Sequence, residues 1–261
     1  MLSEIFPVSM LTDIGSRIVT GTHADAAIAY ISGSLVEGYG TETSDLDIYV
    51  VYDNPTPQQV PEDRSDLYAI ETDFVGELRT DTEVWSLQWL TDLADRISGW
   101  KPMDWLGAQS FENRDLDLAH RFRIGLPILG EDRFHALYER FDWQRLAGII
   151  MLKRFLAYTG AAEDAIGSVD AGRPVASMLH SRDALGYAVD ALLSAHGNTN
   201  PKPKWREAKL TDFGDAALTK LYTEAELDRS SEPADLTEGA KRRLSVASGI
   251  AAEVLAVALE A

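Results

Sequence analysis

The stretch ISGSLVEGYGTETSDLDIYVV, residues 31–51, decides the fold that this sequence predicts. It begins with a glycine–serine pair, Gly33 and Ser34, and ends in a run rich in Ile, Tyr and Val, which is typical of a β-strand. Side chains alternate between the two faces of a strand, so Asp45 and Asp47 share one face, roughly 7 Å apart along the backbone. The apolar residues between and after them face the other way, toward a covering helix.

Paired aspartates on one strand face are typical of a cation site. Two like charges repel, and ionising both in a partly buried cleft is costly, whereas a divalent cation removes that cost. Carboxylate oxygens are the ligands that Mg²⁺ prefers. The stretch RTDTEVW, residues 79–85, predicts a neighbouring strand that supplies a third carboxylate from Asp81 or Glu83, which also share a face. The alternative for the aspartate pair is a solvated edge strand.

The glycine–serine pair adds a phosphate-binding element. Mg²⁺ held by few carboxylates completes its coordination with water and substrate phosphates. Gly33 permits close approach of the backbone, Ser34 offers a hydroxyl, and amide groups at the start of a helical turn bind phosphate. Ser44 is a further donor immediately before the aspartates. This combination suits phosphoryl or nucleotidyl transfer with two metal ions.

Composition limits the class of protein. The chain has 261 residues and no cysteine, which excludes disulfides and thiolate metal sites. Its 42 acidic and 24 basic residues give a net charge of −18, which does not favour a nucleic-acid partner and suits metal ions or a cationic small molecule. The first twenty residues lack a signal peptide pattern, and no apolar run approaches the roughly 18 residues of a membrane span. We expect a soluble cytoplasmic protein without a membrane partner.

The pattern along the chain predicts an α+β protein in two parts. Residues 1–108 read as a small mixed β-sheet domain with flanking helices, and residues 109–261 as an α-helical bundle domain. The predicted elements of the first part are a helix at 3–19, strands at 26–32 and 46–53, a proline-rich loop at 54–66, a hairpin at 67–87 that turns at Gly76, and a helix at 88–100. Long helices of the second part are expected at about 143–158, 174–196 and 234–260.

Gly33–Ser34, a ten-residue spacer and Asp45-x-Asp47 resemble the signature of the DNA polymerase β-like nucleotidyltransferase superfamily. The stretch GELRTDTEVWSLQWL, residues 76–90, is similar to the strand that carries the third carboxylate in small-molecule adenylyltransferases of the kanamycin nucleotidyltransferase type. The order of a catalytic domain and a helical domain also matches those enzymes. The motifs cover residues 25–90, and the helical half resembles the family only in layout.

The resemblance implies a Mg²⁺-dependent enzyme that transfers a nucleoside monophosphate, AMP from ATP, to a hydroxyl of a small molecule and releases pyrophosphate. The acceptor would be an aminoglycoside-like antibiotic or another secondary metabolite, which would make the protein an antibiotic-resistance factor. It implies metal ligands at Asp45, Asp47 and Asp81, with Glu83 still a candidate for the third, and triphosphate contacts at Gly33, Ser34 and Ser44.

The helical half offers two further candidates. The stretch at 198–210 gathers four basic residues around Trp205, and Lys204, with Lys202, is the first choice for a polyphosphate contact; the alternative is an ordinary basic loop. In the kanamycin-type enzymes the general base is a glutamate of the first long helix of the second domain. That position falls near Ala157 here, so either the base lies elsewhere or the acceptor differs. Asp183 is the candidate base, with a solvated helix face as the alternative.

Two other functions compete with this one. A toxin–antitoxin-type or protein-modifying nucleotidyltransferase would act on tRNA or on a protein; the basic stretch favours it and the charge of −18 opposes it. A degenerate domain with a regulatory role is opposed by the complete set of motif residues. The resemblance leaves the oligomeric state open, with a homodimer as one option.

Overall fold

The computed structural model describes residues 6–55, 70–227 and 232–260. By packing, the chain divides into two compact units. We call Met1–Gly99 with Asp117–Asp142 the sheet unit, and Trp100–Leu116 with Trp143–Ala261 the helical unit. The predicted α+β class is confirmed. The predicted domain boundary between residues 108 and 109 stays a prediction. The two packing units are not continuous in sequence: residues 100–116 belong to the helical unit and residues 117–142 to the sheet unit.

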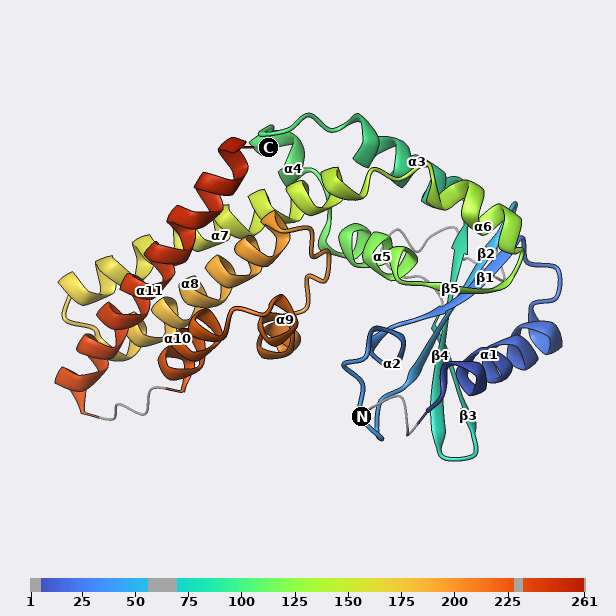
Figure 1. Cartoon of the computed structure of the whole chain (residues 1–261), viewed down its shortest axis with the longest axis horizontal. Coiled ribbons are helices and arrows are strands. Elements are labelled where there is room, and N and C mark those ends of the chain that lie inside the picture. The colour runs from blue at the N-terminus through green and yellow to red at the C-terminus, as the bar shows by residue number, and fades with distance from the viewer. Residues whose placement is uncertain (1–5, 56–69, 228–231, 261) are drawn as a thin grey trace. The chain divides into compact units, whose positions relative to one another are not determined.

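The sheet unit is built around a five-stranded mixed sheet in the order β3-β4-β2-β1-β5 (Figure 1). Strands β2 and β4 are parallel, and the other neighbours are antiparallel. The strands are β1 (Ile28–Ser32), β2 (Leu46–Tyr52), β3 (Ile70–Val75), β4 (Leu78–Ser86) and β5 (Leu126–Leu129). The parallel pair at the centre is what brings the predicted acidic strands side by side.

The strands agree with the sequence, with one exception. The predicted hairpin is present as β3 and β4, and it turns at Gly76 with φ of 65°. Strand β5 was not predicted, since LPIL is short and contains a proline; it lies in the half that was predicted to be helical and pairs with β1 at the edge of the sheet. Most of the predicted proline-rich loop lies outside the described residues.

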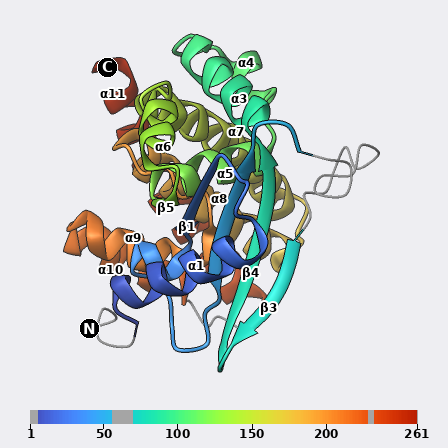
Figure 2. The same cartoon turned by 90° about the vertical axis from the view of Figure 1, so that its right-hand side faces the viewer.

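One face of the sheet packs on α1 (Val8–Thr22) (Figure 2). Leu11 and Ile14 of this helix belong to the same buried cluster as Ile48 and Val50 of β2, as the alternation predicted. The described helix begins at Val8, directly after Pro7, because proline is favourable only at a helix start. The start of the predicted helix at residues 3–5 lies outside the described residues.

The opposite face of the sheet carries aromatic residues and the acidic side chains. Tyr30 stacks on Tyr49 with ring centres 4.9 Å apart, and Phe122 of α5 (Asn113–Arg123) and Phe134 of α6 (Glu131–Tyr138) complete the cluster. The predicted helix after β4 is α3 (Leu87–Gly99). Aromatic packing at one end of this face leaves the acidic residues of β2 and β4 at the other end.

Three long helices form the helical unit: α7 (Trp143–Asp170), α8 (Pro174–Ala195) and α11 (Pro233–Glu260) (Figure 1). All three were predicted, although α7 runs a further twelve residues because nothing in AYTGAAEDAIGSVD stops it before Gly172, whose φ is 64°. Short helices complete the unit: α4 (Trp105–Gln109), η2 (Pro203–Trp205), α9 (Arg206–Phe213) and α10 (Ala216–Glu226). No helix in the described part of the chain has the length and apolarity needed to cross a bilayer.

Candidate active site

The parallel pairing of β2 and β4 brings acidic side chains onto one face. Asp47 is the register partner of Asp81, and Tyr49 is the register partner of Glu83. Residues in register on neighbouring strands point to the same side of a sheet, so Asp47, Asp81 and Glu83 lie on a common face. Asp45 immediately precedes β2, and its charge acts on Asp47. Three of the four residues predicted as metal ligands therefore share one face of the sheet, and the fourth, Asp45, precedes β2 in the chain.

Gly33 lies directly against this carboxylate face. It precedes the short helix α2 (Ser34–Glu37), with φ of 92°, a value that side-chain-bearing residues rarely adopt. A Cβ at this position would lie 1.8 Å from Oδ2 of Asp47. Only glycine therefore lets the turn after β1 touch the aspartate, which gives a physical reason for the glycine of the Gly33–Ser34 pair.

We expect Gly33→Ala to destabilise the protein much more than Gly38→Ala. Both glycines have nearly the same φ, 92° and 91°, so both substitutions cost about 1–2 kcal/mol of backbone strain. Gly38 has open space around it, whereas the new methyl group at Gly33 would collide with Asp47. Urea unfolding should give a difference of at least about 2 kcal/mol between the two variants. Equal losses would mean that the approach of Gly33 to Asp47 is not tight.

Arg121 of α5 is a site residue that the sequence did not predict. Its Nη1 donates a hydrogen bond of 2.9 Å to Oδ2 of Asp47, and its Nε lies 3.8 Å from Asp117. The side chains of Arg121 and Asp47 are mostly buried, 17% and 16% exposed. The spacing of Asp117 and Arg121 indicates a helix face, but no local signal says that this face covers the sheet.

Arg79 forms an ion pair with Asp81 of the same strand, as Arg121 does with Asp47. Its Nε and Nη2 donate to the two oxygens of Asp81 at 3.1 and 2.7 Å, and the Thr72 hydroxyl of β3 donates at 2.8 Å. Arg79 is half exposed, at 51%, so this pair is held less firmly than the buried one. Both aspartates are thus held by arginines as well as by the strand register.

Burial and crowding of charge perturb the acidic residues of this face. Burial raises the pKa of Asp47 to about 6, even though Arg121 opposes the shift, and the charge of Asp45 raises it further. Burial also raises the pKa of Glu83 to about 7; the hydrogen bond from Trp85 opposes this shift, and the charge of Asp47 adds to it. In water these carboxyls would ionise near pH 4, so their charged forms cost free energy in the folded protein.

Glu83→Gln should stabilise the protein in alkaline buffer and leave it unchanged in acid. A carboxyl whose pKa is raised on folding favours the folded state while protonated, so this contribution is present below pH 4.5 and is lost as the pH rises through about 7. Glutamine removes the loss; its single amide oxygen can still accept from the Trp85 N–H, and its NH2 group can donate to the Tyr49 hydroxyl oxygen. In EDTA, urea unfolding should give a gain on the order of 2 kcal/mol at pH 8 and none at pH 4.5.

The matched control for this comparison is Glu77→Gln. Glu77 is exposed in the turn between β3 and β4, so its stability difference from the wild-type protein should stay near zero at both pH values. A Glu83→Gln variant that behaves like this control would contradict the buried, charge-crowded position of Glu83.

The donor set suits a divalent cation in its chemistry. Oδ1 of Asp47 and both oxygens of Asp45 have no hydrogen-bond partner within residues 6–55, 70–227 and 232–260, so they can serve as ligands. A cation would also relieve the repulsion that raises the pKa of Asp47. The cage is not preassembled: in the described residues no three Asp, Glu, His or Cys side chains already converge on one point. A cation bound here would compete with the arginines for Asp47 and Asp81.

The two serines of the motif lie in different turns: Ser34 follows Gly33, and Ser44 directly precedes Asp45. Ser34 is the first residue of α2. The Ser44 hydroxyl oxygen accepts a hydrogen bond of 2.8 Å from the backbone N–H of Thr41, which closes the turn that leads into Asp45. Ser44 thus has a structural task in this turn besides the predicted contact with phosphate.

The predicted phosphate-binding lysines belong to the helical unit. Lys204 is exposed, and its Nζ lies 4.8 Å from the ring centre of Trp205, a cation–π contact. Lys202 is half-buried, and its carbonyl accepts a hydrogen bond of 3.3 Å from Lys209. The predicted base Asp183 is exposed on α8. These roles stay predictions.

The rest of the basic stretch has an internal partner. Arg206 donates to both oxygens of Asp190 at 3.0 and 2.8 Å, and Nζ of the buried Lys209 lies 3.6 Å from the same carboxylate. The guanidinium of Arg206 packs against Gly186, where a Cβ would lie 2.3 Å from Nη1. Asp190 and these two cations therefore form a buried charge cluster that holds α9 on α8.

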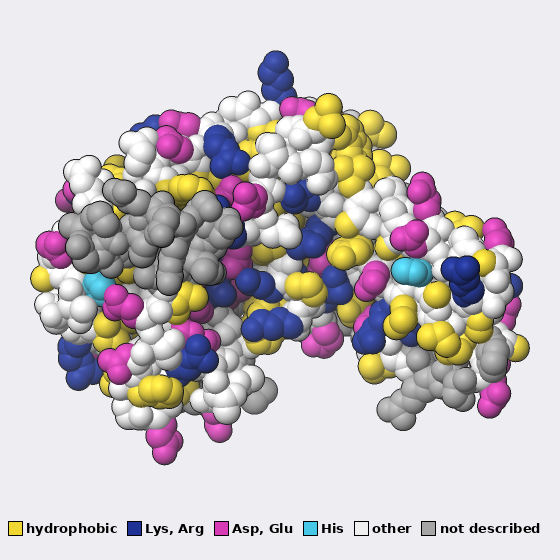
Figure 3. All heavy atoms as spheres, turned by 180° about the vertical axis from the view of Figure 1, so that it is seen from behind, with side chains coloured by type: hydrophobic (Ala, Val, Ile, Leu, Met, Phe, Trp, Pro, Cys, Tyr) yellow, Lys and Arg dark blue, Asp and Glu magenta, His cyan; other side chains and the backbone are white. Residues whose placement is uncertain are grey.

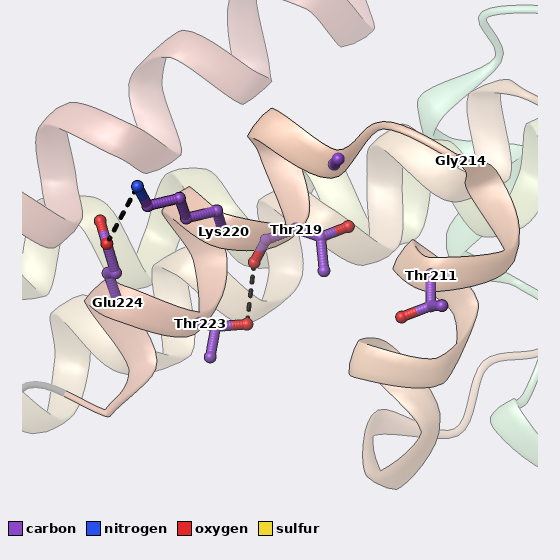
Figure 4. A pocket seen from close by; sticks show the side chains of 7 residues that line it. Thr211, Gly214, Thr219, Lys220, Thr223 and Glu224 are labelled. Carbon is purple, nitrogen blue, oxygen red and sulfur yellow. Dashed lines mark hydrogen bonds and ion pairs between the residues drawn. The ribbon is translucent and has the colours of Figure 1, made fainter.

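A cavity of about 430 Å³ opens along α9 and α10 (Figure 4). The hydroxyls of Thr219 and Thr223 donate to backbone carbonyls of their own helix at 2.8 Å, and Lys220 lies 3.8 Å from Glu224. Its polar groups are thus paired within α9 and α10, and the cavity has no convergent set that would bind a ligand.

The comparisons with known proteins bear on the sheet. Residues 24–105 match the sequence profile of the family described as "Nucleotidyltransferase domain". Residues 24–105 form a nucleotidyltransferase domain. The matched segment contains strands β1 to β4, Gly33, Asp45, Asp47 and Asp81, and it supports a nucleotidyltransferase enzyme.

The fold of the whole chain resembles that of a nucleotidyltransferase-like protein from Exiguobacterium sibiricum 255-15. The two chains are 14% identical, and the similarity covers 93% of this chain and 75% of the other, with a TM-score of 0.51. At this identity the likeness concerns the fold alone. No curated protein matches the sequence.

Proposed function

We propose that this nucleotidyltransferase transfers AMP from ATP to a hydroxyl of a small molecule in the presence of Mg²⁺ and releases pyrophosphate. The observation that carries the proposal is the register of the parallel strands, which sets Asp47 opposite Asp81, with Gly33 against Asp47. The carboxylates supply a place for metal and the turn at Gly33 a place for phosphate, next to each other on one face of the sheet.

Each motif residue has a role in this proposal. Asp45, Asp47 and Asp81 would hold two Mg²⁺ ions, which supply charge neutralisation at the attacking and leaving oxygens. The turn at Gly33–Ser34, with Ser44, would bind the triphosphate, because backbone amides and hydroxyls donate hydrogen bonds to phosphate oxygens. Lys204 and Lys202 remain our candidates for further phosphate contacts.

The reaction is a displacement at the α-phosphorus of ATP. The acceptor hydroxyl oxygen forms a bond to the α-phosphorus, the bond from that phosphorus to the α–β bridging oxygen breaks, and pyrophosphate leaves with the bonding electrons. The proton of the hydroxyl passes to a general base, for which Asp183 is our candidate because a carboxylate exposed on a helix can accept a proton from a bound hydroxyl.

The arrangement of charge favours a small acceptor over tRNA. In the basic stretch that pointed to tRNA, Arg206 and Lys209 pair with the buried Asp190, which leaves little cationic surface for a phosphate polymer. On the face of the protein in Figure 3, acidic side chains are scattered among basic and apolar ones. We place the reaction in the cytoplasm, where ATP is available.

The test is to incubate the protein with each nucleoside triphosphate, Mg²⁺ and a panel of hydroxylated small molecules, both cationic and anionic. We expect pyrophosphate release with ATP, and a product heavier than the acceptor by one AMP residue in mass spectrometry. Labelling of tRNA or of a protein instead would support the second function and refute the small acceptor. A wild-type protein without a thermal shift in ATP and Mg²⁺ would refute both.

A further inference from the structure

A cavity of about 260 Å³ inside the helical unit differs in kind from the cavity along α9 and α10. It lies between α7, α8, the end of α4, the start of α5 and Pro201. Its polar lining comes from Lys153, Arg154, Tyr187, Gln109 and Asn113. Apolar side chains, among them Ala157, form the rest of the wall. The cavity lining therefore combines cations, amides and a phenol with apolar side chains.

The charge of this cavity is unbalanced. Two cationic side chains line it and no acidic residue does, in a chain whose net charge is −18. Neither Lys153 nor Arg154 has a carboxylate partner within the part of the chain that the structure describes. Burial and the neighbouring Arg154 lower the pKa of Lys153, as expected where two like charges lack a counter-ion.

Both cations keep donors to spare. Lys153 uses one of its three N–H groups on the Phe111 carbonyl at 2.7 Å. Arg154 donates through Nη2 to the Pro201 carbonyl at 3.0 Å, and its guanidinium carbon lies 6.0 Å from the ring centre of Tyr187. These contacts fix both head groups in place at the cavity and leave their remaining donors available. A preorganised pair of this kind suits an anion with several acceptor oxygens.

We propose that this cavity binds the phosphate or carboxylate group of a small molecule. Lys153 and Arg154 would supply the charge, Gln109 and Asn113 would donate to further oxygens, and the apolar wall would contact the carbon part of the ligand. The volume suits a phosphate monoester or a small hydroxy acid rather than a large polycyclic compound. An aminoglycoside-like polycation would be repelled here.

The site is tested by titrating the full-length protein with inorganic phosphate and with glycerol phosphate. The titrations are done in EDTA and without nucleotide, so they do not depend on the proposed transferase activity. We expect saturable binding in calorimetry, with NMR shifts at residues of α7 and α8. Arg154→Gln should weaken the binding at least about tenfold, and Lys153→Met similarly, since each removes charge-assisted hydrogen bonds.

Arg173→Gln is the matched control. Arg173 is exposed before α8 and away from the cavity lining, so its loss should change the affinity less than about twofold. The inference is overturned if the wild-type protein shows no saturable binding, or if Arg154→Gln and Arg173→Gln bind equally well. Should the cavity variants fail to fold, the shifts of the wild-type protein still decide: changes confined to the sheet unit would also overturn it.

The same variants identify the source of the anion. ATP in EDTA that binds tenfold more weakly to Arg154→Gln than to the wild-type protein would assign the cavity to nucleotide phosphate. An effect on glycerol phosphate alone would assign it to a different small molecule. Both results support the site, and the second would exclude a nucleotide as its ligand.

Discussion

Asp47→Asn is expected to lower the rate of nucleotidyl transfer by about 1,000-fold, because it removes a charge at the centre of the carboxylate face. Asp47 is the point where the motif elements meet: it stands opposite Asp81, touches the backbone of Gly33 and accepts from Arg121. The rate is measured as pyrophosphate release with ATP, Mg²⁺ and an acceptor found in the panel.

Asp53→Asn is the matched control for this variant. Asp53 follows the same strand, is half exposed and pairs with Arg133 at the surface, so its loss should change the rate less than about threefold. Because Asp47→Asn also takes a partner from Arg121, Asp45→Asn provides a second test without this loss, and we expect a similar fall in rate. Retention of activity by both motif variants would refute the carboxylate site.

Asp81→Asn is expected to cost at least about 100-fold in rate, and Glu83→Gln less than about fivefold. Asp81 stands directly opposite Asp47. Its ion pair with the half-exposed Arg79 is weak, so we expect a metal cation to replace Arg79 as its partner. Glu83 lies one alternation further along β4, where its oxygens accept from Tyr49 and Trp85 at 3.3 Å. The same pyrophosphate assay decides between them.

The reverse order of losses would assign the third ligand to Glu83. Equal, small losses in both variants would mean that only Asp45 and Asp47 hold metal. Circular dichroism at the assay temperature separates these results from unfolding, and Glu83→Gln should be the more stable protein at the alkaline assay pH.

Much of the sheet was predictable because its signals are local. Alternation between Asp45 and Val50 predicted the orientation of β2, and the turn at Gly76 predicted the hairpin that carries Asp81. The need of a metal site for a third carboxylate predicted that the two acidic strands are neighbours, and the likeness to a family agreed with it. Strands β2 and β4 pair in parallel although β3 lies between them in the sequence; in the sheet, β3 lies at the edge beyond β4.

The residues that the sequence did not reveal depend on contacts between distant segments. Arg121 meets Asp47 across 74 positions of the chain, and Asp190 meets Arg206 across 16. No sequence periodicity indicates which distant residue a charged side chain will pair with. The basic stretch therefore appeared as a surface for phosphate, whereas half of it neutralises a buried acid. Strand β5 was also missed, since four residues with a proline carry almost no strand signal.

The buried charge cluster of Asp190, Arg206 and Lys209 sets a lower limit on the size of a workable fragment. A chain cut after α8 would leave Asp190 as an isolated ion in an apolar interior, at a cost on the order of 3–5 kcal/mol. Designed truncations should therefore retain the segment through Lys209. The same limit applies to fusion proteins, whose junctions are better placed beyond α9 than in the loop that precedes it.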